Sequence, residues 1–190
     1  MTTLWLIRHG PTHQKSMTGW RDVPADLSDR AALARLADHL PTGPIVSSDL
    51  IRAVTTADAI QGDRLRLPHD PALREIDFGV WDGLHHTQVS ARDPVLSRQF
   101  WEQPGDLRAP AGESWNDLTQ RVTAAIDALI ATHAPRHLIV VAHMGTIMSQ
   151  FTRAGGSAYQ AMGHSIDPLS VSRMDRGADG WTLGAVNHRP

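Results

Sequence analysis

Two short runs of consecutive apolar residues, at 4–7 and 138–142, stand out in the hydropathy pattern of the chain. Such runs are too short for the core of a helix, whereas a strand covered by helices on both faces is apolar at nearly every position. Each run stops at a histidine, His9 or His143, with a glycine one or two residues further on. We therefore predict two buried parallel strands, each with a histidine at its carboxyl end.

Apolar residues spaced three and four positions apart predict five helices. Ser28 is the expected N-cap of the first helix, and segment 47–49 is the expected cap of the second. Asp93 and the proline after it interrupt the third helix, and Ser114 forms a capping box with Asp117 at the start of the fourth. The predicted helices cover residues 28–40, 50–60, 84–101 in two parts, 115–133, and a segment that begins at Thr146.

The other segments predict short strands and one ordered loop. Segment 73–83 has neither a helical nor a strand period, and its apolar residues Ile76, Phe78 and Trp81 are expected to pack it in place. Strands alternating with helices, followed by a strand pair, predict an α/β fold: a three-layer α/β/α sandwich with a mostly parallel central sheet. We expect a single domain over 1–190, with a short lid-like insertion at about 82–112. The short strands are predicted at 45–46, 65–68, 169–174 and 181–186.

Composition narrows the possible function classes. A net charge of -2 gives no electrostatic footprint for nucleic acid or for an anionic membrane surface. The sequence has no cysteine, which excludes disulfides, thiolate zinc sites and cysteine nucleophiles. Its start does not resemble a signal peptide, and no apolar stretch approaches the ~20 residues of a membrane helix. We therefore expect a cytoplasmic protein that acts on a small molecule without a cofactor.

The residues at the two strand ends suit phosphoryl chemistry. Ligands of open α/β sheets bind outside the carboxyl ends of the strands, which is where Arg8, His9 and His143 are expected. A second arginine, Arg52, lies in the first turn of a predicted helix. Two guanidinium groups match the charge of a phosphoryl group, one imidazole can attack phosphorus, and the other can donate as imidazolium or stabilise the transition state.

The leaving alkoxide of such a reaction needs a proton, so a carboxylic acid should lie nearby. Three carboxylates are candidates for this role. Glu75 and Asp77 lie in the ordered loop, and Glu113 precedes the long helix.

Five segments of the chain, taken in order, form a set of motifs: 6–10 (Leu-Ile-Arg-His-Gly), 47–53, 73–83, 111–114 and 141–145. Together they resemble the motifs of the histidine phosphatase superfamily, in its phosphoglycerate-mutase-like branch, and the resemblance covers nearly the whole chain. It implies that His9 is the phosphorylated nucleophile and that Arg8, Arg52 and His143 form the phosphate pocket. It also implies that Glu75 is the proton donor.

Two positions depart from the usual motif of this family. Pro11 stands where an acidic residue is common, and Lys15 stands where an asparagine commonly contacts the phosphate. The loop after the first strand and the segment 82–112 are also shorter than in the mutases. These differences favour hydrolysis over mutase activity. The predicted substrate contacts are Thr12, Lys15, Gly19 and Met144.

Three other functions remain open on the sequence. A phosphoglycerate mutase would return the phosphoryl group to an organic acceptor, and a phosphate-binding protein would keep the pocket with little turnover. A metal hydrolase would have to use Asp77, Asp82, His85 and His86, but these lack a convincing ligand spacing, so we expect no metal. The natural phosphomonoester and the oligomeric state are left undetermined.

Overall fold

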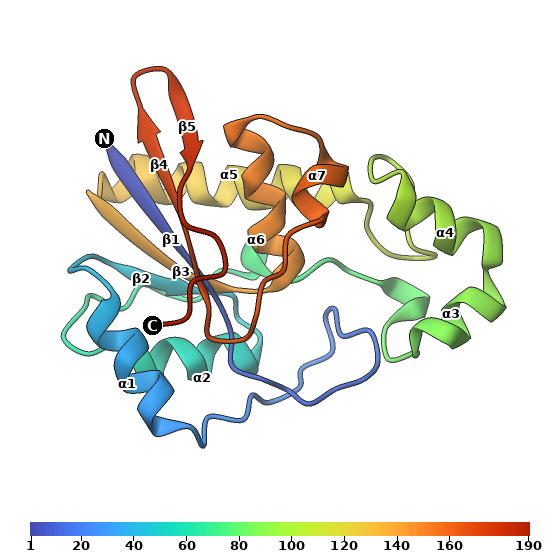
Figure 1. Ribbon diagram of the computed structural model, residues 1–190, viewed down its shortest axis with the longest axis horizontal. Coiled ribbons are helices and arrows are strands. Elements are labelled where there is room, and N and C mark those ends of the chain that lie inside the picture. Colours follow the sequence, from blue (N-terminus) through green and yellow to red (C-terminus); the bar gives the residue numbers. More distant parts are fainter.

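The fold was analysed in a computed structural model of residues 1–190. Its single sheet has the strand order β2-β3-β1-β4-β5 (Figure 1). β1, β2 and β3 run parallel, whereas β4 pairs antiparallel with the other edge of β1 and β5 pairs antiparallel with β4. The predicted strand pair therefore extends the same sheet and makes it mixed. The strands are β1 (Thr2–Arg8), β2 (Ile45–Ser47), β3 (His137–Ala142), β4 (Val171–Gly177) and β5 (Gly180–Leu183).

Helices cover both faces of this sheet and confirm the predicted α/β/α layers. Side chains along β1 and β3 alternate between two apolar clusters, because successive Cβ atoms point to opposite faces of a strand. Ile7 and Ile139 pack with α1 and α2, whereas Leu6 and Val140 pack with α5 and α6. The helices are α1 (Arg30–His39), α2 (Ile51–Ile60), α3 (His86–Arg92), α4 (Pro94–Glu102), α5 (Trp115–His133), α6 (Met144–Phe151) and α7 (Ala158–Met162).

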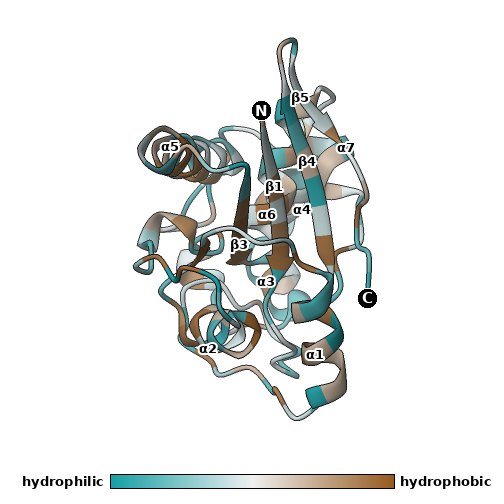
Figure 2. Ribbon diagram, turned by 90° about the vertical axis from the view of Figure 1, so that its left-hand side faces the viewer, coloured by the Kyte–Doolittle hydropathy of each residue, from teal (hydrophilic) through white to brown (hydrophobic).

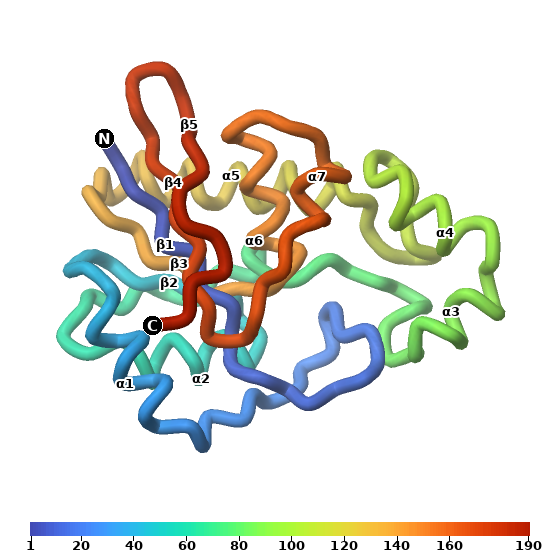
Figure 3. The backbone as a smooth tube through the Cα atoms, in the orientation of Figure 1, coloured from blue at the N-terminus to red at the C-terminus, as the bar shows by residue number.

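The most hydrophobic strands lie in the middle of this layered arrangement. In Figure 2, β3 and the carboxyl half of β1 are hydrophobic, while α1 and α2 lie together on one side of them. The segment between β1 and α1 runs out toward α3 and then returns, as the tube in Figure 3 shows. Backbone hydrogen bonds of Met17 with Gly83 and Leu84 hold it there. No helix combines the length and the apolar character that a membrane span requires.

Several local predictions are confirmed. Ser114 and Asp117 form the capping box of α5. α3 ends at Arg92, and Pro94 occupies the first turn of α4, where its missing N–H costs no helical hydrogen bond. Segment 73–83 is an ordered loop with a 3-10 turn at Gly79–Trp81, and its three apolar side chains are buried.

Other local predictions are wrong, each because a different partner is available in the fold. Asp29, not Ser28, caps α1. Segment 47–49 does not cap α2: the Oδ1 of Asp22, from the distant loop, accepts from the first N–H of that helix at 2.7 Å. Segment 65–68 forms only an isolated bridge with β2 rather than a strand. The last predicted helix begins at Met144, two residues before Thr146.

Candidate active site

The candidate site lies at the carboxyl ends of the neighbouring strands β1 and β3. Arg8 is the last residue of β1 and pairs in register with Ala142, the last residue of β3. His9 and His143 therefore leave the sheet side by side, and their ring centroids lie 5.1 Å apart. The parallel pairing brings together two histidines that are 134 positions apart in the sequence.

The His9 ring is held in one tautomer. Its Nδ1 lies 2.7 Å from the backbone oxygen of Gly10, and because a carbonyl can only accept, Nδ1 carries the hydrogen. The lone pair is then on Nε2. Burial, assisted by the positive charge of Arg52 and Arg8, lowers the pKa of His9 to about 3. His9 is thus a neutral imidazole with a nucleophilic Nε2 at neutral pH.

His143 is held in the opposite tautomer. Its Nδ1 accepts from Nε of Arg52 at 3.2 Å, so the hydrogen of the neutral ring is on Nε2. This Nε2 is buried and has no hydrogen-bond partner within the protein. Burial, followed by the charge interaction with His9 and Arg52, lowers the pKa of His143 well below its ordinary value. Of the two roles left open for the second histidine, donation as imidazolium does not fit this neutral ring, whose Nε2–H is a neutral donor.

Two guanidinium groups, that of the buried Arg52 and that of the half-buried Arg8, make the site positive. Arg52 is 1% exposed, and its terminal nitrogens donate to the carbonyls of Gly19 at 2.6 Å and Arg21 at 2.8 Å. Arg8 donates to the carbonyl of Ile166, and its Nε is buried without a partner. Burial lowers the pKa of both guanidiniums and the nearby charge of Glu75 opposes this effect, so both remain cationic at neutral pH.

Glu75 is the carboxylate that enters the site. Its Oε1 accepts from the backbone N–H of Ile76 at 2.9 Å, and its Oε2 accepts from that of Gly145 at 3.1 Å. A Cβ at position 145 would lie 2.4 Å from Oε1, so only glycine permits this approach. Two donors, Trp20 and Arg121, hold the backbone carbonyl of Glu75 at 2.8 Å each.

The two other candidate acids are occupied elsewhere. Asp77 accepts from the backbone N–H of Gly79 at 2.8 Å. Glu113 forms a two-point ion pair with Arg121, at 2.7 and 2.8 Å, and also accepts from the N–H of residue 77. Neither carboxylate lines the site. Among the three candidates, only Glu75 is placed to exchange a proton with a ligand there.

The Asp82 carboxylate orders the loop beside Arg52. The sequence did not predict this role for it. Asp82 accepts from three consecutive backbone N–H groups, those of Gly19, Trp20 and Arg21, at 2.9–3.2 Å. This arrangement turns the carbonyls of residues 19 and 21 toward the Arg52 guanidinium. No local sequence signal reveals it, because the loop and Asp82 are more than sixty residues apart.

Arg8, His9, Arg52 and Glu75, together with residues of the loop after β1, line a cavity of about 240 Å³. Of the predicted substrate contacts, Thr12 and Met144 line this cavity, whereas Lys15 is exposed and does not; the neighbouring Gln14 lines it instead. Gly19 does not line it either, because its backbone is tied to Asp82 and Arg52. The lining residues are Arg8, His9, Thr12, Gln14, Ser16, Met17, Thr18, Arg52, Glu75, Phe78, Trp101 and Met144.

Sequence reasoning also missed Trp101, which reaches the cavity from α4. Its only sequence signal was the presence of an aromatic residue in the segment expected to cover the site. His143 is fully buried beside His9 and does not itself line the cavity.

The residues considered for a metal site are not brought together. No three His, Asp or Glu side chains are grouped so that they could hold a metal ion. Asp82 is bound to the loop, and the His85 ring caps α3 through the N–H of Thr87. The cavity therefore offers an anion two guanidinium groups and the neutral imidazole of His9, with the His143 ring buried beside that imidazole.

Comparison with known proteins agrees with this geometry. Residues 4–189 match the family model "Histidine phosphatase superfamily (branch 1)". A protein of Cronobacter sakazakii named probable phosphoglycerate mutase GpmB is 31% identical over 99% of this chain and 95% of its own length. The bifunctional protein Rv2228c of Mycobacterium tuberculosis is 33% identical over 94% of this chain, which spans about half the length of that relative.

A solved structure extends the likeness to three dimensions. The crystal structure of a putative alpha-ribazole-5'-P phosphatase from Escherichia coli superposes with a TM-score of 0.85. The two chains are 25% identical, and the match covers 99% of this chain and 97% of the other. The predicted resemblance and fold class are thereby confirmed.

Proposed function

Because the chain belongs to the histidine phosphatase superfamily, we propose that it hydrolyses a small phosphate monoester through a phosphohistidine on His9. The observation that carries the proposal is the state of the His9 ring. It is neutral, its Nδ1 is bound to the Gly10 carbonyl, and its nucleophilic nitrogen lies in a cavity that two arginines make positive. A neutral imidazole beside fixed positive charge is what attack on an anionic phosphorus centre requires.

The phosphoryl group is bound by donors that the protein leaves without partners. Arg8 Nε and His143 Nε2 are two of only four buried side-chain polar atoms that lack a hydrogen-bond partner. Arg52, which donates to Nδ1 of His143, adds its charge to the site. Because buried polar groups are normally satisfied, these two donors fit the oxygens of a bound phosphoryl group.

In the first step, Nε2 of His9 attacks phosphorus, the P–N bond forms, and the ester P–O bond breaks. The leaving oxygen takes a proton from the Glu75 carboxyl group. The positive charge that develops on the imidazole is stabilised by the Nδ1–H hydrogen bond to Gly10. Arg8, Arg52 and His143 stabilise the charge on the equatorial oxygens.

In the second step, water attacks the phosphohistidine. Glu75, now ionised, takes a proton from this water, the P–N bond breaks, and inorganic phosphate leaves. His9 returns to its neutral form and Glu75 to its acid form. The positive charge in both steps comes from arginine, so the proposed reaction needs no metal ion.

Mutase activity is the second candidate, because one relative is named a probable phosphoglycerate mutase. A mutase must hold a phosphorylated acid while the phosphoryl group moves. Arg8 and Arg52 are the only cationic side chains that line the cavity. In the proposed reaction the phosphoryl group uses the charge of both. No further cation lines the cavity to meet a substrate carboxylate, which favours water as the acceptor.

The test is hydrolysis of p-nitrophenyl phosphate in excess EDTA by the wild type and by His9→Ala. We expect chelator-resistant release of phosphate by the wild type, none by the variant, and acid-labile phosphate on His9 after rapid quenching. Loss of activity in EDTA that a divalent metal restores would overturn the metal-independent route. Turnover without label on His9 would overturn the covalent intermediate.

Glu75→Gln tests the proton donor. The amide keeps the shape of the side chain but has no proton to give, so an alkyl phosphate should lose about 10²–10⁴-fold in kcat/KM. An activated aryl phosphate, whose leaving group needs no proton, should lose far less. An equal loss on both esters, measured side by side, would remove Glu75 from the acid role.

A further inference from the structure

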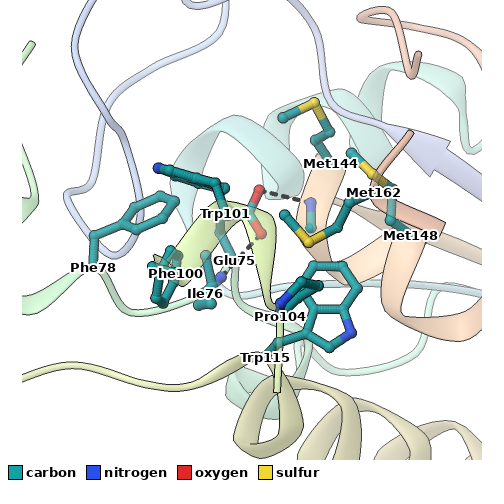
Figure 4. Close-up of a pocket in the computed structure, with 11 residues that line it drawn as sticks. Glu75, Ile76, Phe78, Phe100, Trp101, Pro104, Trp115, Met144, Met148 and Met162 are labelled. Atoms are coloured by element: carbon teal, nitrogen blue, oxygen red, sulfur yellow. Dashed lines mark hydrogen bonds between the residues drawn. The ribbon is translucent and has the colours of Figure 1, made fainter. Parts of the chain in front are cut away.

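A second cavity lies beside the Glu75 carboxylate. It has a volume of about 150 Å³, and Glu75 is the only charged residue that lines it. Figure 4 shows the rings of Phe78, Phe100, Trp101 and Trp115 and three methionine side chains surrounding the Glu75 carboxylate. The other lining residues, Ile76, Pro104 and Gly145, add no polar side chain. The lining residues are Glu75, Ile76, Phe78, Phe100, Trp101, Pro104, Trp115, Met144, Gly145, Met148 and Met162.

This apolar cavity adjoins the cavity of about 240 Å³ in the candidate active site, called the phosphate cavity below. Glu75, Phe78, Trp101 and Met144 line both. Trp101 and Met144 are 43% and 40% exposed, so these two boundary side chains have space to move. The wall between the cavities is therefore made of the proton donor and of side chains that can adjust to a ligand.

The proposed chemistry fixes what must cross this boundary. The donor of the proton must touch the bridging oxygen of the ester, and the first carbon of the alcohol is one bond from that oxygen. A group attached to this carbon therefore starts beside Glu75. The apolar cavity begins at the same residue.

The lining determines which group fits. Lysine and arginine are absent from it, so a carboxylate in this cavity would have no cationic partner. Taking an unpaired carboxylate out of water is strongly unfavourable, whereas burial of an uncharged ring is favourable. An engineered apolar cavity of about 150 Å³ in another protein binds one benzene molecule. The space suits one ring of that size.

We propose that the substrates are monophosphates of alcohols that carry an uncharged, apolar or aromatic group of about one ring, which the second cavity binds. The inference rests on the proposed function, because that function places the bridging oxygen of the ester beside Glu75. It makes phosphorylated hydroxy acids poor substrates. Specificity then comes from the apolar lining and not from a cationic recognition site.

The first experiment compares kcat/KM for 2-phenylethyl phosphate, ethyl phosphate and 3-phosphoglycerate. The first two esters have primary alkoxide leaving groups of nearly equal basicity, so they differ mainly in the ring. We expect the phenyl ester to exceed ethyl phosphate by about tenfold or more, and 3-phosphoglycerate to be the poorest. Equal values for the two alkyl esters, or a preference for 3-phosphoglycerate, would overturn the inference.

Binding of unreactive analogues separates this inference from the proposed function. In 3-phenylpropylphosphonate and propylphosphonate, a methylene replaces the bridging oxygen of the same two esters. We expect calorimetry to show about tenfold tighter binding of the phenyl compound, whether or not the esters are hydrolysed. If this preference is present without turnover, the proposed function fails while the apolar site stands. If turnover is present without this preference, the apolar site fails while the proposed function stands.

Met162→Lys tests the location of the ring. Met162 is half-buried and lines only the apolar cavity, so its lysine variant places a cation there without touching the phosphate pocket. We expect about a tenfold loss of the phenyl preference and unchanged inhibition by inorganic phosphate, which also reports that the site is folded. Val95→Lys is the matched control, because Val95 is 59% exposed on α4 and lines neither cavity. An unchanged phenyl preference in Met162→Lys would overturn the assignment.

Discussion

The two strand-end histidines have the same chemical structure and similar surroundings, yet they are set up for opposite tasks. Both follow a buried parallel strand, and both are at most 6% exposed. His9 donates through Nδ1 to a carbonyl, so its Nε2 carries the free lone pair. His143 accepts through Nδ1 from Arg52, so its Nε2 is a hydrogen-bond donor. A single partner on one ring nitrogen decides the role of the other nitrogen.

Arg52 has a central place in this comparison. One guanidinium fixes the His143 tautomer, lowers the pKa of His9 through its charge, and holds the loop carbonyls of Gly19 and Arg21. The planar fork of arginine allows these contacts in fixed directions, which a lysine ammonium cannot reproduce. The difference between the two histidines therefore depends on a third residue.

The largest expected effect is the loss of the nucleophile. His9→Ala should lower kcat by about 10⁴-fold or more, because no other group in the cavity can form the covalent intermediate. The measurement is single-turnover release of phosphate, with circular dichroism to check the fold. Retention of a tenth of the activity would show that the two histidines do not have the distinct roles described above.

The next effect is the loss of one donor to the phosphoryl oxygens. His143→Ala should lower kcat by about 10²–10³-fold, the usual cost of one donor to a developing charge. In this variant the label should still be found on His9, although it forms slowly. Mass spectrometry of the quenched protein makes the comparison. Label on His143 in the wild type would invert the assignment.

A smaller effect is expected when Arg52 keeps its charge but loses its shape. Arg52→Lys should lower kcat/KM by about 30-fold, because the loss of the Nε–H contact frees the His143 tautomer while a positive charge stays nearby. Nitrogen chemical shifts of the histidine rings measure the tautomer directly. An unchanged spectrum for His143 would show that Arg52 does not select its tautomer.

The smallest effect on activity concerns pH. Because the pKa of His9 is about 3, its Nε2 stays unprotonated from pH 8 down to pH 5. Protonation of His9 should therefore change kcat/KM by less than about twofold over this range. A histidine with its ordinary pKa of 6.5 would lose about 30-fold by pH 5. Such a loss, assigned to His9 by its own titration in nuclear magnetic resonance spectra, would contradict the burial effect.

Stability should respond to pH where activity does not. The two histidines are neutral in the folded protein but are protonated in the unfolded chain below pH 6.5. The unfolded state then binds more protons, so the free energy of unfolding is full above pH 6.5 and falls as pH decreases below it. For His9, with its pKa of about 3, the fall is about 1.4 kcal/mol per pH unit, and His143 adds to it in the same direction. Urea unfolding at pH 7 and 5 measures it, and His9→Ala should show a smaller fall. An equal fall in the variant would contradict the prediction.

Local sequence explains the parts of the fold that depend on near neighbours. The buried strands, the capping box at Ser114 and the break before Pro94 were predictable because each depends on residues within a few positions. Contacts between segments distant in the sequence were not predictable in this way. The cap of α2 by Asp22 and the three-point binding of the loop by Asp82 join segments that only the tertiary structure brings together.

The same distinction applies to the site. The sequence by itself determined the two histidines and Arg8 at the strand ends, Arg52 in the first turn of a helix and the candidate acid Glu75, because each lies in or beside an element with a strong local pattern. Only the tertiary structure decided that Gln14 and not Lys15 lines the cavity, which tautomer each histidine adopts, and that an apolar cavity adjoins Glu75. The physical reason is that a tautomer or a cavity belongs to a set of partners distant in sequence, whereas a strand and its terminal histidine are encoded locally.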